Sequence, residues 1–116
     1  KATLQRRRKQ IVYGEEGGYA PSATTDEEAL DMIAETLERL GEENCMIALD
    51  VAATRFYDHA LRRYIVRGRK TGSDGLISWY KELAEEYPIC SIEDGLHEDD
   101  WAGWKVLTAE LSSQVQ

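Results

Sequence analysis

The sequence predicts an α/β fold in which parallel strands alternate with helices. Two short apolar runs, residues 45–49 and 89–92, have the continuous hydrophobicity of strands that are covered on both faces. Other segments repeat their apolar residues at helical spacing. Because the connections between strands are long enough for crossovers, we expect parallel pairing. Three strands are few for an open sheet or a barrel, so we expect a slice of a larger domain.

The first 21 residues alternate between regular and irregular patterns. Residues 1–9 have helical composition and end in four cations, Arg6 to Lys9, which suit the negative end of a helix dipole. Residues 11–13 predict a short strand. Residues 14–21 contain two adjacent glycines and a proline, which interrupt both helical and strand periodicity, so they predict a loop.

The next segment predicts an amphipathic helix. Thr25 and Glu28 have the spacing of a capping box at its start. The apolar residues that follow recur on one helical face: Leu30, Ile33, Ala34, Leu37 and Leu40. Gly41 is expected to end the helix.

Polar residues and a less regular segment follow the first apolar strand. Asp50 closes the run 45–49. Residues 56–70 mix aromatic and basic residues with glycine, which suggests a hairpin insertion around residues 64–66. We assign no functional residue to the segment 58–72.

The last part of the chain repeats the helix and strand patterns. A second amphipathic helix starts near Ser73 and ends at Pro88, which cannot continue it. Glu93 closes the strand 89–92. A third helical face contains Trp101, Trp104, Leu107 and Leu111, with Glu98, Asp99 and Asp100 in its first turn. We expect the tryptophans of these helices, Trp79, Trp101 and Trp104, to pack in the core.

The composition excludes several classes of function. A net charge of −8 and a pI near 4.7 disfavour binding to nucleic acid, including an RNA site built on Arg6 to Lys9. No apolar run approaches the roughly 18 residues of a membrane helix, and the first residues lack a signal peptide, so we expect a cytoplasmic protein. Cys45 and Cys90 lie far apart in apolar runs and predict buried free thiols.

Carboxylates follow each of the three predicted strands. They are Glu16 in the glycine-rich loop, Asp50 and Glu93, so they gather at the carboxyl ends of the strands, where α/β folds carry their sites. Like charges so close require a cation, and oxygen ligands suit Mg²⁺. The alternative is that these acids only cap helices, which is common and needs no metal. Glu15 and Asp94 fit that ordinary role.

Three sequence blocks resemble enolases in order and spacing. They are residues 14–21 (GEEGGYAP), 47–53 (IALDVAA) and 91–101 (SIEDGLHEDDW). The resemblance runs through almost all of residues 1–116 and implies a piece of the catalytic TIM-type (β/α) barrel of an enolase, with about three strand–helix units. Glu15 stands where many enolases have Asp, and Gly95-Leu96 is similar to bacterial members.

The resemblance also implies functional roles. Glu16 would protonate the departing hydroxyl of 2-phosphoglycerate, and Asp50 and Glu93 would bind Mg²⁺ as the cofactor of its dehydration to phosphoenolpyruvate. The family's catalytic lysine, its third metal aspartate and the residues that hold substrate match no position of this sequence. We expect that aspartate a few residues after Gln116, on a strand that Val115 begins. Enolases are commonly dimers or larger, so the parent protein is expected to be a homo-oligomer.

Two functions of different classes follow. The first is part of a glycolytic enolase, a hydro-lyase, with no turnover in this piece alone because the lysine base is missing. The second is a non-catalytic module, derived from an enolase, that binds Mg²⁺ or associates with other chains. The chain starts without a methionine and its last residues are strand-like, so we expect a piece of a longer protein.

Overall fold

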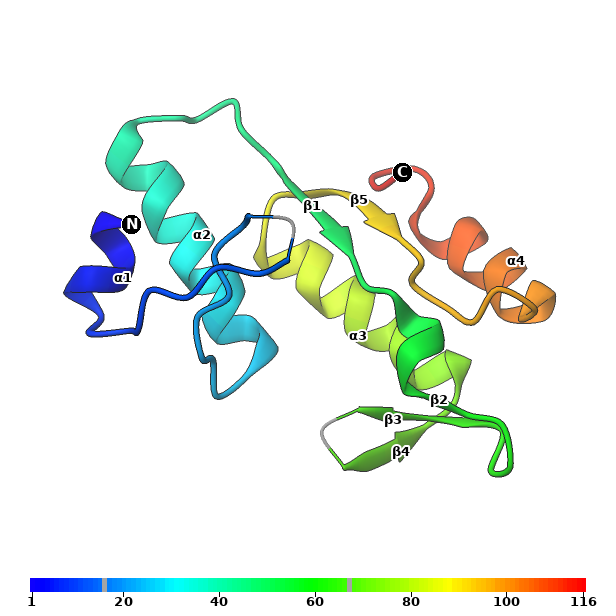
Figure 1. The fold of residues 1–116 in the computed structure, drawn as a ribbon. Helices are drawn as coiled ribbons and strands as arrows, with labels where there is room; N and C mark the ends of the chain where they lie inside the picture. The colour runs from blue at the N-terminus through cyan, green and yellow to red at the C-terminus, as the bar shows by residue number, and fades with distance from the viewer. Residues whose placement is uncertain (16, 67) are drawn as a thin grey trace. The chain divides into compact units, whose positions relative to one another are not determined.

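A computed structural model describes the chain except residues 16 and 67 (Figure 1). It forms two compact units, Lys1–Cys45 and Met46–Gln116. Among the described residues, no helix combines the length and apolar character needed to cross a membrane.

The first unit contains two helices, α1 (Ala2–Arg6) and α2 (Asp26–Leu40). Helix α1 is shorter than the predicted helix 1–9 because Arg8 adopts a left-handed conformation with φ of 54°. The start of α2 agrees with the prediction, since the Thr25 hydroxyl accepts the N–H of Glu28 at 3.1 Å. Gly41 ends α2 as predicted, with φ of 69° in the left-handed region that glycine adopts without strain.

The apolar face predicted for α2 is only partly correct. Leu30 is buried, but Ile33 is 44% exposed and Leu40 is 68% exposed. Met32, which the predicted face did not include, is buried instead. Periodicity identified the helix but not the side that packs, because that side depends on partners elsewhere in the unit.

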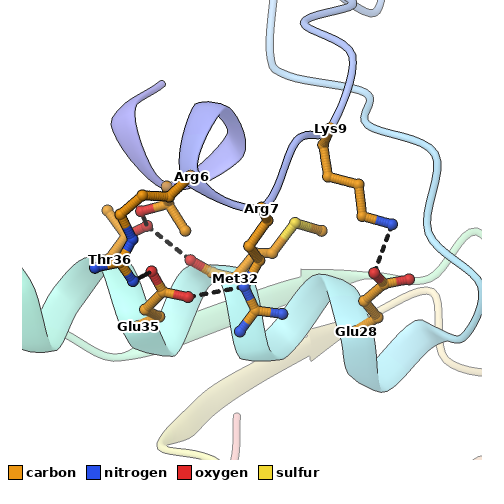
Figure 2. Close-up of polar contacts among 8 residues, drawn as sticks. Arg6, Arg7, Lys9, Glu28, Met32, Glu35 and Thr36 are labelled. Atoms are coloured by element: carbon orange, nitrogen blue, oxygen red, sulfur yellow. Dashed lines mark hydrogen bonds and ion pairs between the residues drawn. The ribbon is translucent and has the colours of Figure 1, made fainter.

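Polar contacts join α1 to α2 (Figure 2). Arg6 and Arg7 both pair with Glu35, and the Arg7 Nε to Glu35 oxygen distance is 2.7 Å. Lys9 pairs with Glu28 at 2.5 Å. The hydroxyls of Thr3 and Thr36 lie 2.8 Å apart. Three of the four cations predicted at a helix terminus therefore form ion pairs within this unit.

The predicted strand 11–13 is wrong. In the part of the chain that the structure describes, Tyr13 forms an isolated antiparallel bridge with Tyr19, across the glycine-rich loop, and belongs to no strand. The N–H of Ala20 donates to the Val12 carbonyl at 2.9 Å, so this segment bonds to the other end of its own loop. A local turn with two glycines competes successfully with strand pairing here.

The second unit is built on a parallel strand pair. Strand β1 (Ile47–Asp50) pairs in parallel with β5 (Ile89–Glu93), and helix α3 (Ser73–Glu86) lies in the crossover between them. Helix α4 (Trp101–Leu111) follows β5 (Figure 1). This strand–helix–strand–helix order is the mixed α/β arrangement predicted for part of a TIM-type barrel.

Main-chain bonds extend this sheet at the end of the chain. Gln116 accepts the Ile92 N–H and donates to the Cys90 carbonyl, both at 2.9 Å. Gln116 thus bonds to the residues on either side of Ser91, which is the hydrogen-bond pattern of two parallel strands. These groups of β5 point away from β1, so Gln116 begins pairing on the other edge, as expected for a strand starting near Val115.

The hairpin predicted around residues 64–66 is confirmed as part of a small antiparallel sheet. After a short 3₁₀ helix, η1 (Ala53–Phe56), the strands β2 (Tyr57–Asp58), β3 (Arg63–Val66) and β4 (Arg69–Thr71) follow in the order β2-β3-β4. Tyr64, at the centre of β3, is 1% exposed. The insertion therefore packs on the unit through aromatic side chains that include Tyr64, although most of its described charged residues are exposed.

Two burial predictions need correction. Trp101 is 79% exposed because α4 buries Gly103, Leu107 and Leu111, a face that lies about a third of a turn away at 100° per residue. Trp104 and Trp79 are half-buried. Cys45 is exposed and Cys90 is partly buried, so the thiols are free, as predicted, but not fully buried.

Candidate functional site

A register shift aligns the two acidic residues that close β1 and β5. Ile47 is paired with Ile89, whereas Ala48 is paired with Ser91, so β5 contains one extra residue at Cys90. Asp50 is consequently the partner of Glu93; without the shift it would oppose Ile92. A shift of one residue would also turn one side chain to the other face of the sheet. The irregularity therefore pairs the two predicted metal ligands.

Asp50 and Glu93 meet the main requirements of a shared cation site. As register partners on neighbouring strands about 4.8 Å apart, they extend from the same face of the sheet. Both are exposed, so water and a cation can reach their carboxylates. Their oxygen-only chemistry suits Mg²⁺, which is often held by one or two carboxylates with water and substrate in the remaining positions.

The chain after each carboxylate turns sharply. Ala52 and Asp94 both have φ of 49°, a left-handed conformation that costs energy for residues other than glycine. The two turns are bonded to each other, because the Val51 N–H donates to the Glu93 carbonyl at 3.0 Å and the Ala53 N–H donates to the Asp94 carbonyl at 2.9 Å. The segments carrying the two acids are thus held together beyond the end of the sheet.

The helix-cap alternative does not account for Asp50 or Glu93. Gly72 occupies the N-cap position of α3, Ala52 that of η1, and Asp100 that of α4. The Asp100 carboxylate accepts the Gly103 N–H at 2.9 Å, so the capping acid after β5 is Asp100. Within the described part of the chain, however, no group of three His, Cys, Asp or Glu residues could hold a metal ion. The metal role of Asp50 and Glu93 therefore stays a prediction.

The glycine-rich loop forms the tight turn predicted for it. The Gly14 N–H donates to the Gly18 carbonyl at 2.8 Å and Gly17 has φ of 82°. The rings of Tyr13 and Tyr19 close the loop with centroids 5.3 Å apart. Glu16 itself lies outside the described residues, so its role as proton donor stays a prediction.

Sequence analysis missed a polar and aromatic cluster beside β5. His97, which is buried, contacts Tyr57 and His59 at ring-centroid distances of 4.6 and 5.1 Å, in the wall of an open cavity of about 700 Å³. Its Nδ1 accepts the Asp99 N–H at 3.1 Å. No spacing pattern connects these residues, because they come from separate elements.

The family described as "Enolase, C-terminal TIM barrel domain" matches residues 1–116. The chain belongs to the enolase family. In this enolase segment, β1, α3 and β5 correspond to a strand–helix–strand unit of the barrel, and Asp50 and Glu93 end its two strands. The carboxyl ends of barrel strands are where TIM-barrel enzymes carry their active sites.

Proposed function

We propose that this enolase segment supplies acidic residues of an active site that dehydrates 2-phosphoglycerate to phosphoenolpyruvate. In the proposal, Asp50 and Glu93 bind Mg²⁺ and Glu16 protonates the departing hydroxyl. The observation that carries the proposal is the register pairing of Asp50 with Glu93 at the carboxyl ends of β1 and β5. The resemblance of the glycine-rich loop to enolases supports the role of Glu16.

The dehydration of 2-phosphoglycerate requires acidic residues for two purposes, to bind Mg²⁺ and to donate a proton. Removing the proton next to the substrate carboxylate builds up negative charge, and bound Mg²⁺ stabilises that charge. Asp50 and Glu93 would hold the cation with their carboxylate oxygens. Glu16, in its protonated form, would transfer its proton to the leaving hydroxyl, which departs as water. The carbon-bound proton is taken by a lysine in the family, and no residue of this sequence is assigned that role.

We therefore propose that the 116-residue chain has no turnover by itself. The parent enzyme would work in cytoplasmic glycolysis as a homo-oligomer, with a small-molecule substrate and no nucleic acid or membrane partner. A second proposal retains the same carboxylate pair without catalysis, as a Mg²⁺-binding or interaction module. The exposed Trp101 and Val106 on α4 favour such association with another chain.

Magnesium titration of thermal stability tests the metal site. If Asp50 and Glu93 bind Mg²⁺, a concentration ten times the dissociation constant should stabilise the chain by about 1.4 kcal/mol. Asp50→Asn and Glu93→Gln should each abolish most of this gain, because each removes one charged ligand. The gain would be measured as the shift of the melting curve followed by circular dichroism.

Asp94→Asn is a matched control for this titration. It removes a charge next to Glu93, and asparagine tolerates the left-handed conformation of residue 94. We expect Asp94→Asn to retain the Mg²⁺ response. If the unmodified 116-residue chain shows no response to Mg²⁺, or if Asp50→Asn responds fully, the metal assignment is refuted. Turnover by the chain alone would refute the proposed inactivity.

A further inference from the structure

The loop after Glu93 is held by aromatic side chains from three elements. The Tyr80 hydroxyl, from α3, donates to the Gly95 carbonyl at 2.7 Å. The Tyr64 hydroxyl, from β3, accepts the His97 N–H at 2.8 Å. The Trp104 Nε1–H, from α4, donates to the His97 carbonyl at 3.1 Å. The main-chain N–H and carbonyl of His97 are thus both bonded to aromatic side chains.

Tyr64 has a central place among these contacts. Its hydroxyl also lies 3.5 Å from the Asp100 carboxylate, at the other end of the loop. The same carboxylate accepts the Ser73 hydroxyl and the N-terminal N–H of α4 from Gly103. Burial is the main cause that raises the pKa of Tyr64, so its hydroxyl keeps its proton at neutral pH. One buried hydroxyl therefore links the middle of the loop to its end.

The loop is in turn bonded to the segment after Asp50. The carbonyls of Glu93 and Asp94 accept the N–H groups of Val51 and Ala53. A displacement of the loop would loosen these two bonds first, because they lie just beyond the last register pair of the sheet. The bonds between β5 and Gln116 are on the opposite edge and should be less affected.

From these contacts we propose that Tyr64 is a positioning residue for the Asp50–Glu93 pair. The small sheet β2-β3-β4 would then serve to hold the loop that follows Glu93, through the hydroxyl of Tyr64 and the main chain of His97. The consequence for Mg²⁺ binding rests on the function proposed above. The coupling between Tyr64 and the loop does not, and it can be measured without metal.

Tyr64→Phe in the whole chain tests the coupling. The variant keeps the ring and removes only the hydroxyl. Amide hydrogen exchange, measured by NMR, should become about tenfold faster at Val51, Ala53 and His97, in line with the loss of one buried hydrogen bond. The amides of Ile92 and Gln116 should change little, because their bonds are on the other edge of β5.

Tyr57→Phe is the matched control. The Tyr57 ring packs on Tyr64 with centroids 5.0 Å apart, and this variant leaves the Tyr64 hydroxyl in place. We expect no local acceleration at Val51 or Ala53. Trp104→Phe, which removes the indole N–H bond to the His97 carbonyl, should reproduce the local pattern of Tyr64→Phe and provides a second variant if Tyr64→Phe folds poorly.

A second measurement uses Mn²⁺ as the probe of the metal site. Tyr64→Phe should weaken Mn²⁺ binding, followed by electron paramagnetic resonance, by about tenfold, while Tyr57→Phe should not. Equal acceleration of all amides, or none at Val51 and Ala53, would overturn the positioning role. Failure of the unmodified chain to bind Mn²⁺ would overturn the proposed metal site instead, and the exchange pattern would still decide the role of Tyr64.

Discussion

At the scale of single residues, charge pairs and caps account for much of the local structure. Glu28 shows how one side chain combines several roles. Its N–H donates to the Thr25 hydroxyl at the start of α2, while its carboxylate accepts from Lys9 and from the Thr24 N–H. The hydrogen bond from Lys9 is the main cause that lowers the pKa of Glu28 from 4.5 to about 2.

This lowered pKa predicts a dependence of stability on pH. A carboxylate whose pKa is lower in the folded state stabilises the fold above its unfolded pKa. The contribution of Glu28 should therefore be complete above about pH 5 and should fall as the pH drops from about 4.5 to 2. Glu28→Gln should lower the denaturation midpoint at pH 7 and have little effect near pH 2.

Helical circular dichroism during urea denaturation would measure this difference. Glu38→Gln is the control, since Glu38 is an exposed carboxylate on the same helix. An effect of Glu28→Gln that is the same at pH 7 and pH 2 would show that the carboxylate charge is not the cause. Because Glu28 is close to the surface, high salt should also weaken the effect.

At the scale of elements, Asp100 connects three of them. Its carboxylate caps α4 through Gly103 and accepts hydroxyls from α3 and β3. A β-carbon at Gly103 would lie 2.4 Å from this carboxylate, so a larger residue there would force the Asp100 side chain to shift. The prediction that Glu98, Asp99 and Asp100 lie in the first turn of this helix is wrong: all three precede α4, and Asp100 is its N-cap.

Asp100→Ala should therefore destabilise the second unit by about 1 to 2 kcal/mol, the usual cost of a lost N-cap. The additional loss of the Tyr64 contact places the expected value in the upper part of this range. Urea denaturation would measure the change in the free energy of unfolding. Asp99→Ala, at an exposed neighbouring position, should change it little. Equal effects of the two substitutions would contradict the role of Asp100 as the cap.

At the scale of the whole molecule, apolar surface and strand edges are left open. In the described residues, β1 pairs with β5 alone, so its other edge presents unpaired main-chain groups. Ala48 is exposed on this strand. Trp101, 79% exposed, and Val106, 49% exposed, form apolar surface on α4. Such features favour association of the chain with itself or with other barrel elements.

Trp101→Gln should therefore reduce self-association without lowering stability. The side chain contributes apolar surface to solvent and little to the core, so its removal should change the free energy of unfolding by no more than about 0.5 kcal/mol. Light scattering coupled to size-exclusion chromatography would follow the mean mass. A sharp, cooperative melt of a monomer at high concentration would contradict the expected association.

Local patterns predicted much of this protein from sequence. The capping box, the glycine C-cap and the helical periods depend on neighbours three or four residues away, and the two apolar runs that became β1 and β5 were equally clear. The acids at the ends of these strands were identifiable because a polar residue ends each apolar run. The enolase blocks added the roles that these patterns alone left open.

Tertiary structure decided which of these residues meet. The extra residue at Cys90 aligns Asp50 with Glu93, the loop bridge replaces the predicted strand 11–13, and α4 turns Trp101 to solvent. The link from Tyr64 to His97 spans 33 positions of sequence. The strand register, the buried face of a helix and a bond between distant residues all depend on contacts between segments far apart in sequence. A local sequence pattern does not contain that information.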